Sequence, residues 1–255
     1  MGGILCQEAG VMHRFYVDQN APAVSSEVAL TPEDARHALK VLRMRPGEEA
    51  MIISGGLRFA AELSRIEGNA VFFRVKEPLP STEPGLRITL FQGLPKGDKM
   101  EWIIQKAVEL GIAEIVPVRM ARSVVRLDAA DAEKKRERWQ RIAREAGKQS
   151  GRCLIPQVAL PCLLPDLPAR AESLDACAVP WEEAEAGGPR SFFEAHPHLR
   201  SLGILIGPEG GIEPAEIRAI APRFQPITLG SRILRTETAG LACAAAFLGL
   251  YGEME

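Results

Sequence analysis

The chain has 255 residues, of which 46% are hydrophobic and 25% are charged, enough to build one large or two small domains. No apolar run reaches the roughly 18–20 residues of a membrane span, and residues 1–11 lack the basic and apolar regions of a signal peptide. Five scattered cysteines without a CxxC pair argue against a disulfide framework and a metal site. We therefore expect a cytoplasmic protein with no metal and no membrane partner.

The net charge of −2 does not favour nucleic acid, but the basic residues are unevenly distributed. Residues 119–152 contain eleven Lys or Arg and five Asp or Glu, a local balance of +6. A local basic surface on a nearly neutral protein fits a phosphate-binding footprint. A solvated helix face with i,i+4 ion pairs explains the same pattern equally well. Charge alone leaves both interpretations open.

The N-terminal part is predicted to be mostly β. Residues 1–11 are weakly patterned, which predicts a disordered extension. Short β-prone runs separated by glycine-containing turns then predict a small barrel-like domain over residues 12–80. One helix interrupts these strands, with Thr31 as its N-cap and Pro32 at its first position. Pro78, Pro80 and Pro84 mark a linker, which is assigned to residues 81–85.

Strands and helices alternate in residues 86–255, which predicts a parallel α/β domain. The longest expected helix covers residues 131–149, and the last covers residues 236–250 with an alanine-rich interior suited to close packing. Two glycine-containing segments, 207–211 and 229–239, each follow an expected strand. Because ligands bind at the carboxyl ends of strands in such sheets, these segments are predicted to form two walls of one small-molecule site.

The first segment, Gly-Pro-Glu-Gly-Gly at 207–211, matches neither the dinucleotide-binding nor the P-loop fingerprint. Pro208 removes a backbone donor and Glu209 adds negative charge, so the segment is poorly suited to cradle a phosphate. A cationic ligand suits this carboxylate better. A purely structural strand-to-helix turn is the alternative.

In the second segment, Ile233 and Leu234 are apolar residues of a loop, and an adenine ring would cover them. Arg235 lies beside the expected site and suits a phosphate or a ligand carboxylate. Thr236 is expected to be the N-cap of the last helix. Glu237 lies in its first turn, where the helix dipole favours a carboxylate, so capping is weighed slightly above catalysis.

Three further basic residues follow the first two strands of this domain. Lys96 and Lys99 begin a helix and could contact RNA phosphates, although surface lysines at a helix start are an equally good explanation. Arg122, followed by Ser123, is expected at the same edge of the sheet.

The order of these motifs resembles the RsmE family, bacterial methyltransferases that modify N3 of one uridine in small-subunit ribosomal RNA. The resemblance spans residues 12 to about 251, nearly the whole chain. Its matching segments are 42–44 with 46–47, 96–101, 105–111, 122–123, 143–146 with 149–152, 207–211 and 229–239. The last two segments are highly specific. Gly147 and Lys148 depart from the family pattern, in which a small residue and an acid are more usual.

This family belongs to the SPOUT class. The resemblance therefore implies a C-terminal α/β domain with a deep trefoil knot over residues 86–255, preceded by a PUA-like β-barrel over residues 12–80. It also implies a homodimer and S-adenosylmethionine bound by the knot loops. Motif position places Ile206, Gly207, Glu209, Gly210, Leu229, Ser231 and Leu234 at the cofactor. The residues expected to contact RNA are Arg14, Arg43, Arg45, Lys96, Lys99 and Arg152.

The implied reaction requires an unpaired uridine whose N3 proton is lost. Arg235 or Arg122 is expected to stabilise the anionic uracil, and Arg122 could come from the partner subunit. Glu237 is the candidate general base. The expected partner is 16S rRNA or the small ribosomal subunit. Two alternatives stay open: a related knotted methyltransferase acting on another RNA, and a ribosome-associated RNA-binding protein without catalysis.

Overall fold

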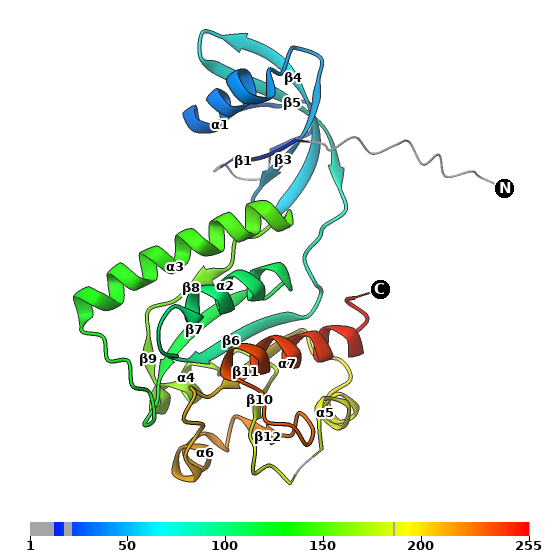
Figure 1. Cartoon of the computed structure of the whole chain (residues 1–255). Helices are drawn as coiled ribbons and strands as arrows, with labels where there is room; N and C mark the ends of the chain where they lie inside the picture. The colour runs from blue at the N-terminus through cyan, green and yellow to red at the C-terminus, as the bar shows by residue number, and fades with distance from the viewer. Residues whose placement is uncertain (1–12, 18–21, 186, 255) are drawn as a thin grey trace, which may run out of the picture. The chain divides into compact units, whose positions relative to one another are not determined.

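The computed structural model describes residues 13–17, 22–185 and 187–254. The extension predicted over residues 1–11 therefore lies outside the described residues. The chain divides into two units, Met1–Thr82 and Glu83–Glu255 (Figure 1). In the described part of the chain, no helix combines the length and the apolar character needed to cross a membrane.

The N-terminal unit contains a five-stranded sheet in the order β1-β3-β4-β5-β2. Its strands are β1 (Arg14–Tyr16), β2 (Glu27–Ala29), β3 (Glu49–Ser54), β4 (Leu57–Glu67) and β5 (Ala70–Leu79). Strand β1 runs parallel to β3, and the other neighbouring pairs are antiparallel. Two register shifts interrupt the long β4–β5 pair, and such bulges bend a sheet.

The helix of this unit begins as predicted, because the Thr31 hydroxyl accepts a hydrogen bond from the Asp34 N–H at 3.1 Å. Helix α1 (Pro32–Arg36) then continues into a π-helical turn, η1 (His37–Leu42), which the sequence did not indicate. Arg43 ends this turn in a left-handed conformation. The next residue, Met44, is buried in the core, and both Arg43 and Arg45 beside it are exposed.

The C-terminal unit is built on a seven-stranded sheet in the order β12-β10-β11-β6-β7-β8, with β9 also paired to β7. Its strands are β6 (Arg87–Gly93), β7 (Glu114–Arg119), β8 (Gln157–Val158), β9 (Cys162–Leu163), β10 (Ala176–Pro180), β11 (Ser201–Ile206) and β12 (Gln225–Ile227). Every pairing in this sheet is parallel. The predicted parallel α/β architecture is therefore confirmed.

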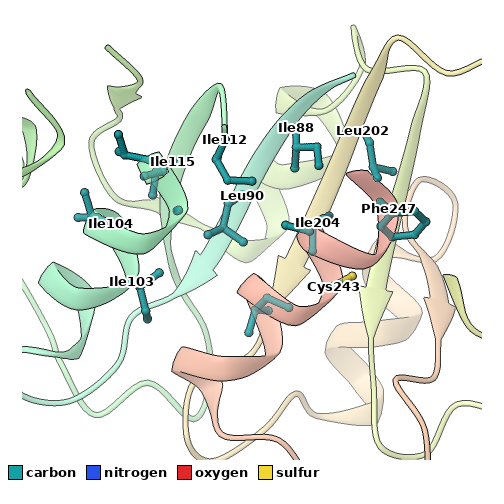
Figure 2. Close-up of a cluster of buried hydrophobic side chains, with 14 of the residues drawn as sticks. Ile88, Leu90, Ile103, Ile104, Ile112, Ile115, Leu202, Ile204, Cys243 and Phe247 are labelled. Atoms are coloured by element: carbon teal, nitrogen blue, oxygen red, sulfur yellow. The ribbon is translucent and has the colours of Figure 1, made fainter. Parts of the chain in front are cut away.

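Helices cover both faces of the sheet. They are α2 (Lys99–Glu109), α3 (Ala129–Ser150), α4 (Leu167–Arg170) with the 3-10 turn η2 (Leu164–Asp166), α5 (Pro189–Ala195), α6 (Pro214–Ile220) and α7 (Thr236–Leu250). Successive strand residues face opposite sides, so Leu90 of β6 packs under α2 and α7 while Phe91 packs against Phe224 on the α6 side. Figure 2 shows side chains of α2 and α7 directed at β6 and β11.

The structure corrects the prediction for Arg152. Its side chain is only 5% exposed, and its Nε donates to the Glu83 carboxylate at 2.9 Å. Its Nη1 donates to the backbone oxygens of Val108 and Ile112, both at 2.9 Å. A guanidinium that is buried and bound in this way is not presented to an RNA phosphate. Glu83, expected in the linker, is instead held within the C-terminal unit by this pair.

Because the strands are parallel, their carboxyl ends meet at one edge of the sheet. The connections after β6, β7, β10, β11 and β12 therefore converge there. These connections contain the first glycine segment, residues 229–235 of the second, Lys96 and Arg122, and Lys99 is the first residue of α2 after the β6 connection. The fold thus places nearly all predicted site residues of this unit on one edge.

Candidate active site

A cavity of about 530 Å³ opens at this edge between the loops that follow β11 and β12. A smaller hollow of about 190 Å³ shares Pro180, Glu182, Leu234 and other walls with it, so the two form one groove. The groove is lined by all seven residues expected at the cofactor: Ile206, Gly207, Glu209, Gly210 and Leu234 around the larger part, and Leu229, Ser231 and again Leu234 around the smaller. The sequence motifs, 20 residues apart, thus converge on one site.

The loop over residues 207–211 is pressed against the chain that follows β7. Gly211 closes a turn with a φ of +73°, a conformation suited to glycine, and its N–H donates to the Pro208 carbonyl at 2.9 Å. A side chain at Gly210 would lie 2.9 Å from the Cβ of Arg122. The Arg122 Nη1 donates to the Gly210 carbonyl at 2.8 Å. Arg122 therefore supports the loop from behind rather than lining the cavity.

Thr236 fastens the two glycine segments to the sheet. Its hydroxyl donates to the Gly207 carbonyl at 2.6 Å and accepts from the Gln92 Nε2 at 2.9 Å. The predicted N-cap role is wrong, because Arg235 occupies the N-cap position without a side-chain cap and the buried Thr236 is the first helical residue. Sequence reasoning missed Gln92. Its only signal is a polar side chain within the otherwise apolar end of β6.

Lys99, the first residue of α2, lines the cavity and forms ion pairs with residues of the loop after β11 and of α7. Its Nζ lies 3.0 Å from a Glu209 carboxylate oxygen and 3.3 Å from one of Glu237. The Lys96 backbone N–H also donates to Glu209 at 3.1 Å. Two carboxylates thus neutralise Lys99, which differs from its predicted role as a phosphate contact. The exposed side chain of Lys96 is compatible with that role.

These contacts shift the pKa of each group in a definite direction. Burial alone would raise the pKa of the Glu209 carboxyl, but hydrogen bonds from its own N–H, from Lys99 and from Lys96 lower it overall. The backbone N–H of Glu237 lowers the pKa of that carboxyl, with Lys99 contributing. The hydrogen bond to Glu209 raises the pKa of Lys99. All three groups are therefore charged at neutral pH.

Arg235 and Ile233 face the groove without being covered. Arg235 is exposed, lines the cavity and makes no ion pair with any residue that the structure describes. Ile233 lines both parts of the groove and is 83% exposed, which is unusual for a branched apolar side chain. Glu182 also lines both parts, and sequence reasoning missed it because it lies outside both glycine segments. The groove thus combines an apolar surface with charges of both signs.

A family model described as the RNA methyltransferase domain matches residues 82–248, and one described as the RNA methyltransferase PUA domain matches residues 30–76. The class is therefore that of RNA methyltransferases with an N-terminal PUA domain.

The similar proteins narrow this class. The chain is 38% identical to ribosomal RNA small subunit methyltransferase E of Bacillus subtilis over 92% of this chain and 95% of the relative. It is 32% identical to the protein of that name from Mycobacterium bovis, over 93% and 90% of the two chains. A crystal structure of the Neisseria gonorrhoeae protein of that name, bound to S-adenosyl methionine, is 34% identical. It has a TM-score of 0.79 and covers 94% of this chain and 98% of that one. The chain belongs to the family of ribosomal RNA small subunit methyltransferase E, the RsmE family.

Proposed function

We propose that the protein is an S-adenosylmethionine-dependent methyltransferase that methylates N3 of a specific uridine in 16S rRNA of the small ribosomal subunit. The observation that carries the proposal is the single groove formed by all seven expected cofactor residues. Membership of the RsmE family supports it, as does the relative from Neisseria gonorrhoeae, described as bound to S-adenosyl methionine.

The residues of the groove fit this cofactor. Leu229, Ile233 and Leu234 provide apolar surface that an adenine ring would cover, which explains why Ile233 is so exposed in their company. Glu182 makes no ion pair with the described residues and offers a carboxylate to a cationic group. Glu209 is already paired with Lys99 and instead holds the loop in place. When bound, S-adenosylmethionine supplies a methyl group activated by the positive charge on sulfur.

On the RNA side, the target uridine must be unpaired, because its N3 lies on the Watson–Crick edge. Arg235 lines the cavity and its guanidinium makes no ion pair with the described residues, so we assign it the stabilisation of the negative charge that uracil gains when the N3 proton leaves. Arg122 positions Gly210, and a partner subunit's copy remains a second source of positive charge. Glu237 is the candidate base, although its lowered pKa makes it a weak one. Orientation of N3 toward the methyl group therefore carries much of the acceleration.

We also propose the finer features of the fold that the family implies. For the knot, support comes from the path after β11: the chain passes beyond β10 to the outer strand β12, then returns so that α7 packs on β11 and β6. Along this return the Thr228 N–H approaches, at 3.4 Å, the carbonyl of Gly187, which lies in the connection between β10 and α5. For a closed barrel in the N-terminal unit, support comes from the two bulges in the long β4–β5 pair. A homodimer and a cytoplasmic location follow from the same family membership.

The N-terminal unit is proposed to bind RNA through Arg14, Arg43 and Arg45. All three are exposed, and Met44 anchors the last two from the core. Such residues position RNA through its phosphates without reading its sequence.

Calorimetry with S-adenosylmethionine and transfer of a labelled methyl group to small subunits and to deproteinised 16S rRNA test the proposal. We expect cofactor binding in both wild type and Arg235→Ala, with turnover at saturating RNA at least tenfold lower in the variant. Undiminished turnover would rule out the role of Arg235. Absence of cofactor binding by the wild type would rule out the proposed enzyme.

A further inference from the structure

A groove of about 1000 Å³ runs between helices α2 and α3, outside the cofactor groove. Helix α2 contributes Trp102 and Gln105, and helix α3 contributes Arg138, Arg141, Glu145 and Gln149. Two of the family-like segments, 105–111 and 143–146 with 149–152, therefore meet at one surface. Neither segment has a role in the cofactor site described above.

Trp102 is the most informative residue of this groove. It is 45% exposed, whereas Trp139 on α3 is only 4% exposed and belongs to the core. The two residues after Trp102, Ile103 and Ile104, are fully buried and already form the core-facing stripe of α2. The indole is therefore not needed to hold α2 on the sheet. It presents a flat aromatic surface to whatever enters the groove.

The charges suit a base inside the groove and phosphates around it. Arg138 is fixed on the wall by an ion pair with Glu101 at 2.8 Å, whereas Arg141 makes no ion pair with the described residues. With Glu145 also present, the groove itself carries balanced charge. Helix α3 as a whole carries seven Lys or Arg against four Asp or Glu, an excess of three positive charges. An uncharged base fits the balanced interior, and the basic surroundings attract the backbone.

We propose that this groove binds one unpaired nucleotide of the RNA substrate, with its base stacked on Trp102 and its edge facing the amide side chains of Gln105 and Gln149. Amides, guanidinium groups and aromatic rings are the chemistry by which proteins hold splayed-out RNA bases. Trp102 lies three residues after Lys99, about one helical turn from a lining residue of the cofactor cavity. The bound nucleotide would thus lie close in space to the cavity that holds the target uridine. The proposal rests on the proposed function, because it names part of the substrate of that site.

The test compares wild type with Trp102→Ala, Trp102→Phe and Arg141→Ala. The probe is a fluorescein-labelled single-stranded RNA of mixed sequence, followed by deproteinised 16S rRNA. We expect Trp102→Ala to weaken RNA binding about five- to hundredfold, as loss of one stacked base does, while Trp102→Phe stays within about threefold of wild type. RNA should quench tryptophan fluorescence in wild type and much less in Trp102→Phe. Arg144→Ala, on the same helix but outside the groove, measures the effect of losing one positive charge.

Several outcomes would overturn the inference. Unchanged RNA affinity in Trp102→Ala, or an Arg141→Ala effect no larger than that of Arg144→Ala, would show that the groove does not hold RNA. Weaker RNA binding accompanied by a changed sedimentation coefficient would show that the groove joins two copies of the chain. Calorimetry with S-adenosylmethionine keeps the two proposals apart. Intact cofactor binding with lost RNA binding supports the groove, whereas a wild type that binds RNA there but transfers no methyl group refutes only the proposed function.

Discussion

The substitution Thr236→Val probes the contact that ties both glycine segments to the sheet. Valine keeps nearly the shape of threonine but removes the bonds to the Gly207 carbonyl and from the Gln92 amide. The Gln92 Nε2 keeps a second acceptor, the Gly93 carbonyl at 3.1 Å, so the greater loss falls on the carbonyl of the half-buried Gly207, directly after β11. Each of the two lost hydrogen bonds contributes about 1 kcal/mol net to stability, and the Gly207 carbonyl also loses its side-chain donor. Together these losses predict a destabilisation of about 2–4 kcal/mol.

Urea unfolding of wild type, Thr236→Val and the exposed control Thr238→Val measures this loss of free energy. Because Gly207 lines the cofactor cavity, we also expect the affinity for S-adenosylmethionine to fall about tenfold in Thr236→Val alone. A change in the free energy of unfolding below about 0.5 kcal/mol, with normal cofactor affinity, would show that Thr236 does not hold the loop. It would mean that the loop is held mainly by its contacts with Arg122.

Three further substitutions test other parts of the structure. Arg152→Ala removes a buried guanidinium that bonds the Glu83 carboxylate and two backbone carbonyls, and it should destabilise the protein by about 3–5 kcal/mol in urea unfolding, without changing RNA affinity. Ile233→Ala should weaken S-adenosylmethionine binding about five- to thirtyfold by calorimetry, with little change in stability because the side chain is 83% exposed. Glu209→Gln should lower the melting temperature by an amount that is constant between about pH 5 and pH 10, where Lys99 and both carboxylates are charged.

The sign of the pH effect follows from the direction of each shift. The carboxyl pKa values lie below their usual 4.5, so the stabilisation is fully present above that value and is lost as acid protonates the carboxylates. The pKa of Lys99 lies above its usual 10.5, so its part is lost only in stronger alkali. A melting-temperature difference that persists at about pH 2 would contradict the ion-pair origin.

Controls separate these effects from general ones. Leu57→Ala removes an apolar side chain of 48% exposure from the N-terminal unit and should leave cofactor affinity unchanged, in contrast to Ile233→Ala. An Arg152→Ala protein that retains its stability but loses RNA affinity would instead restore the original prediction for this residue.

Most of the fold and the centre of the site could be predicted from local patterns in the sequence. Strand and helix periodicity predicted the parallel α/β unit, and turn chemistry placed the two glycine segments at the ends of their strands. The π-helical turn η1 escaped prediction, because a six-residue change of winding leaves no hydrophobic pattern of its own. The knot was expected from family resemblance alone, because no pattern argument produces a threaded connection.

The errors share one physical cause. The Arg152–Glu83 pair joins residues 69 positions apart, and the Gln92–Thr236 bond joins residues 144 positions apart. In both cases the neighbouring sequence predicts an exposed side chain or a helix cap. In the folded chain that polar side chain is instead bonded to a residue far away in the sequence. Lys99 follows the same rule, because Glu209 and Glu237 are brought to it only by the folded sheet edge. Long-range pairing therefore limits how far roles can be assigned from sequence.

The most direct test of the central claim is nucleoside analysis of 16S rRNA. Small subunits that lack the modification are incubated with the purified protein and S-adenosylmethionine, and the digested rRNA is examined by mass spectrometry. One 3-methyluridine per 16S rRNA is the expected product. Cofactor-binding protein that yields no 3-methyluridine, from either subunits or deproteinised rRNA, would contradict the proposed function.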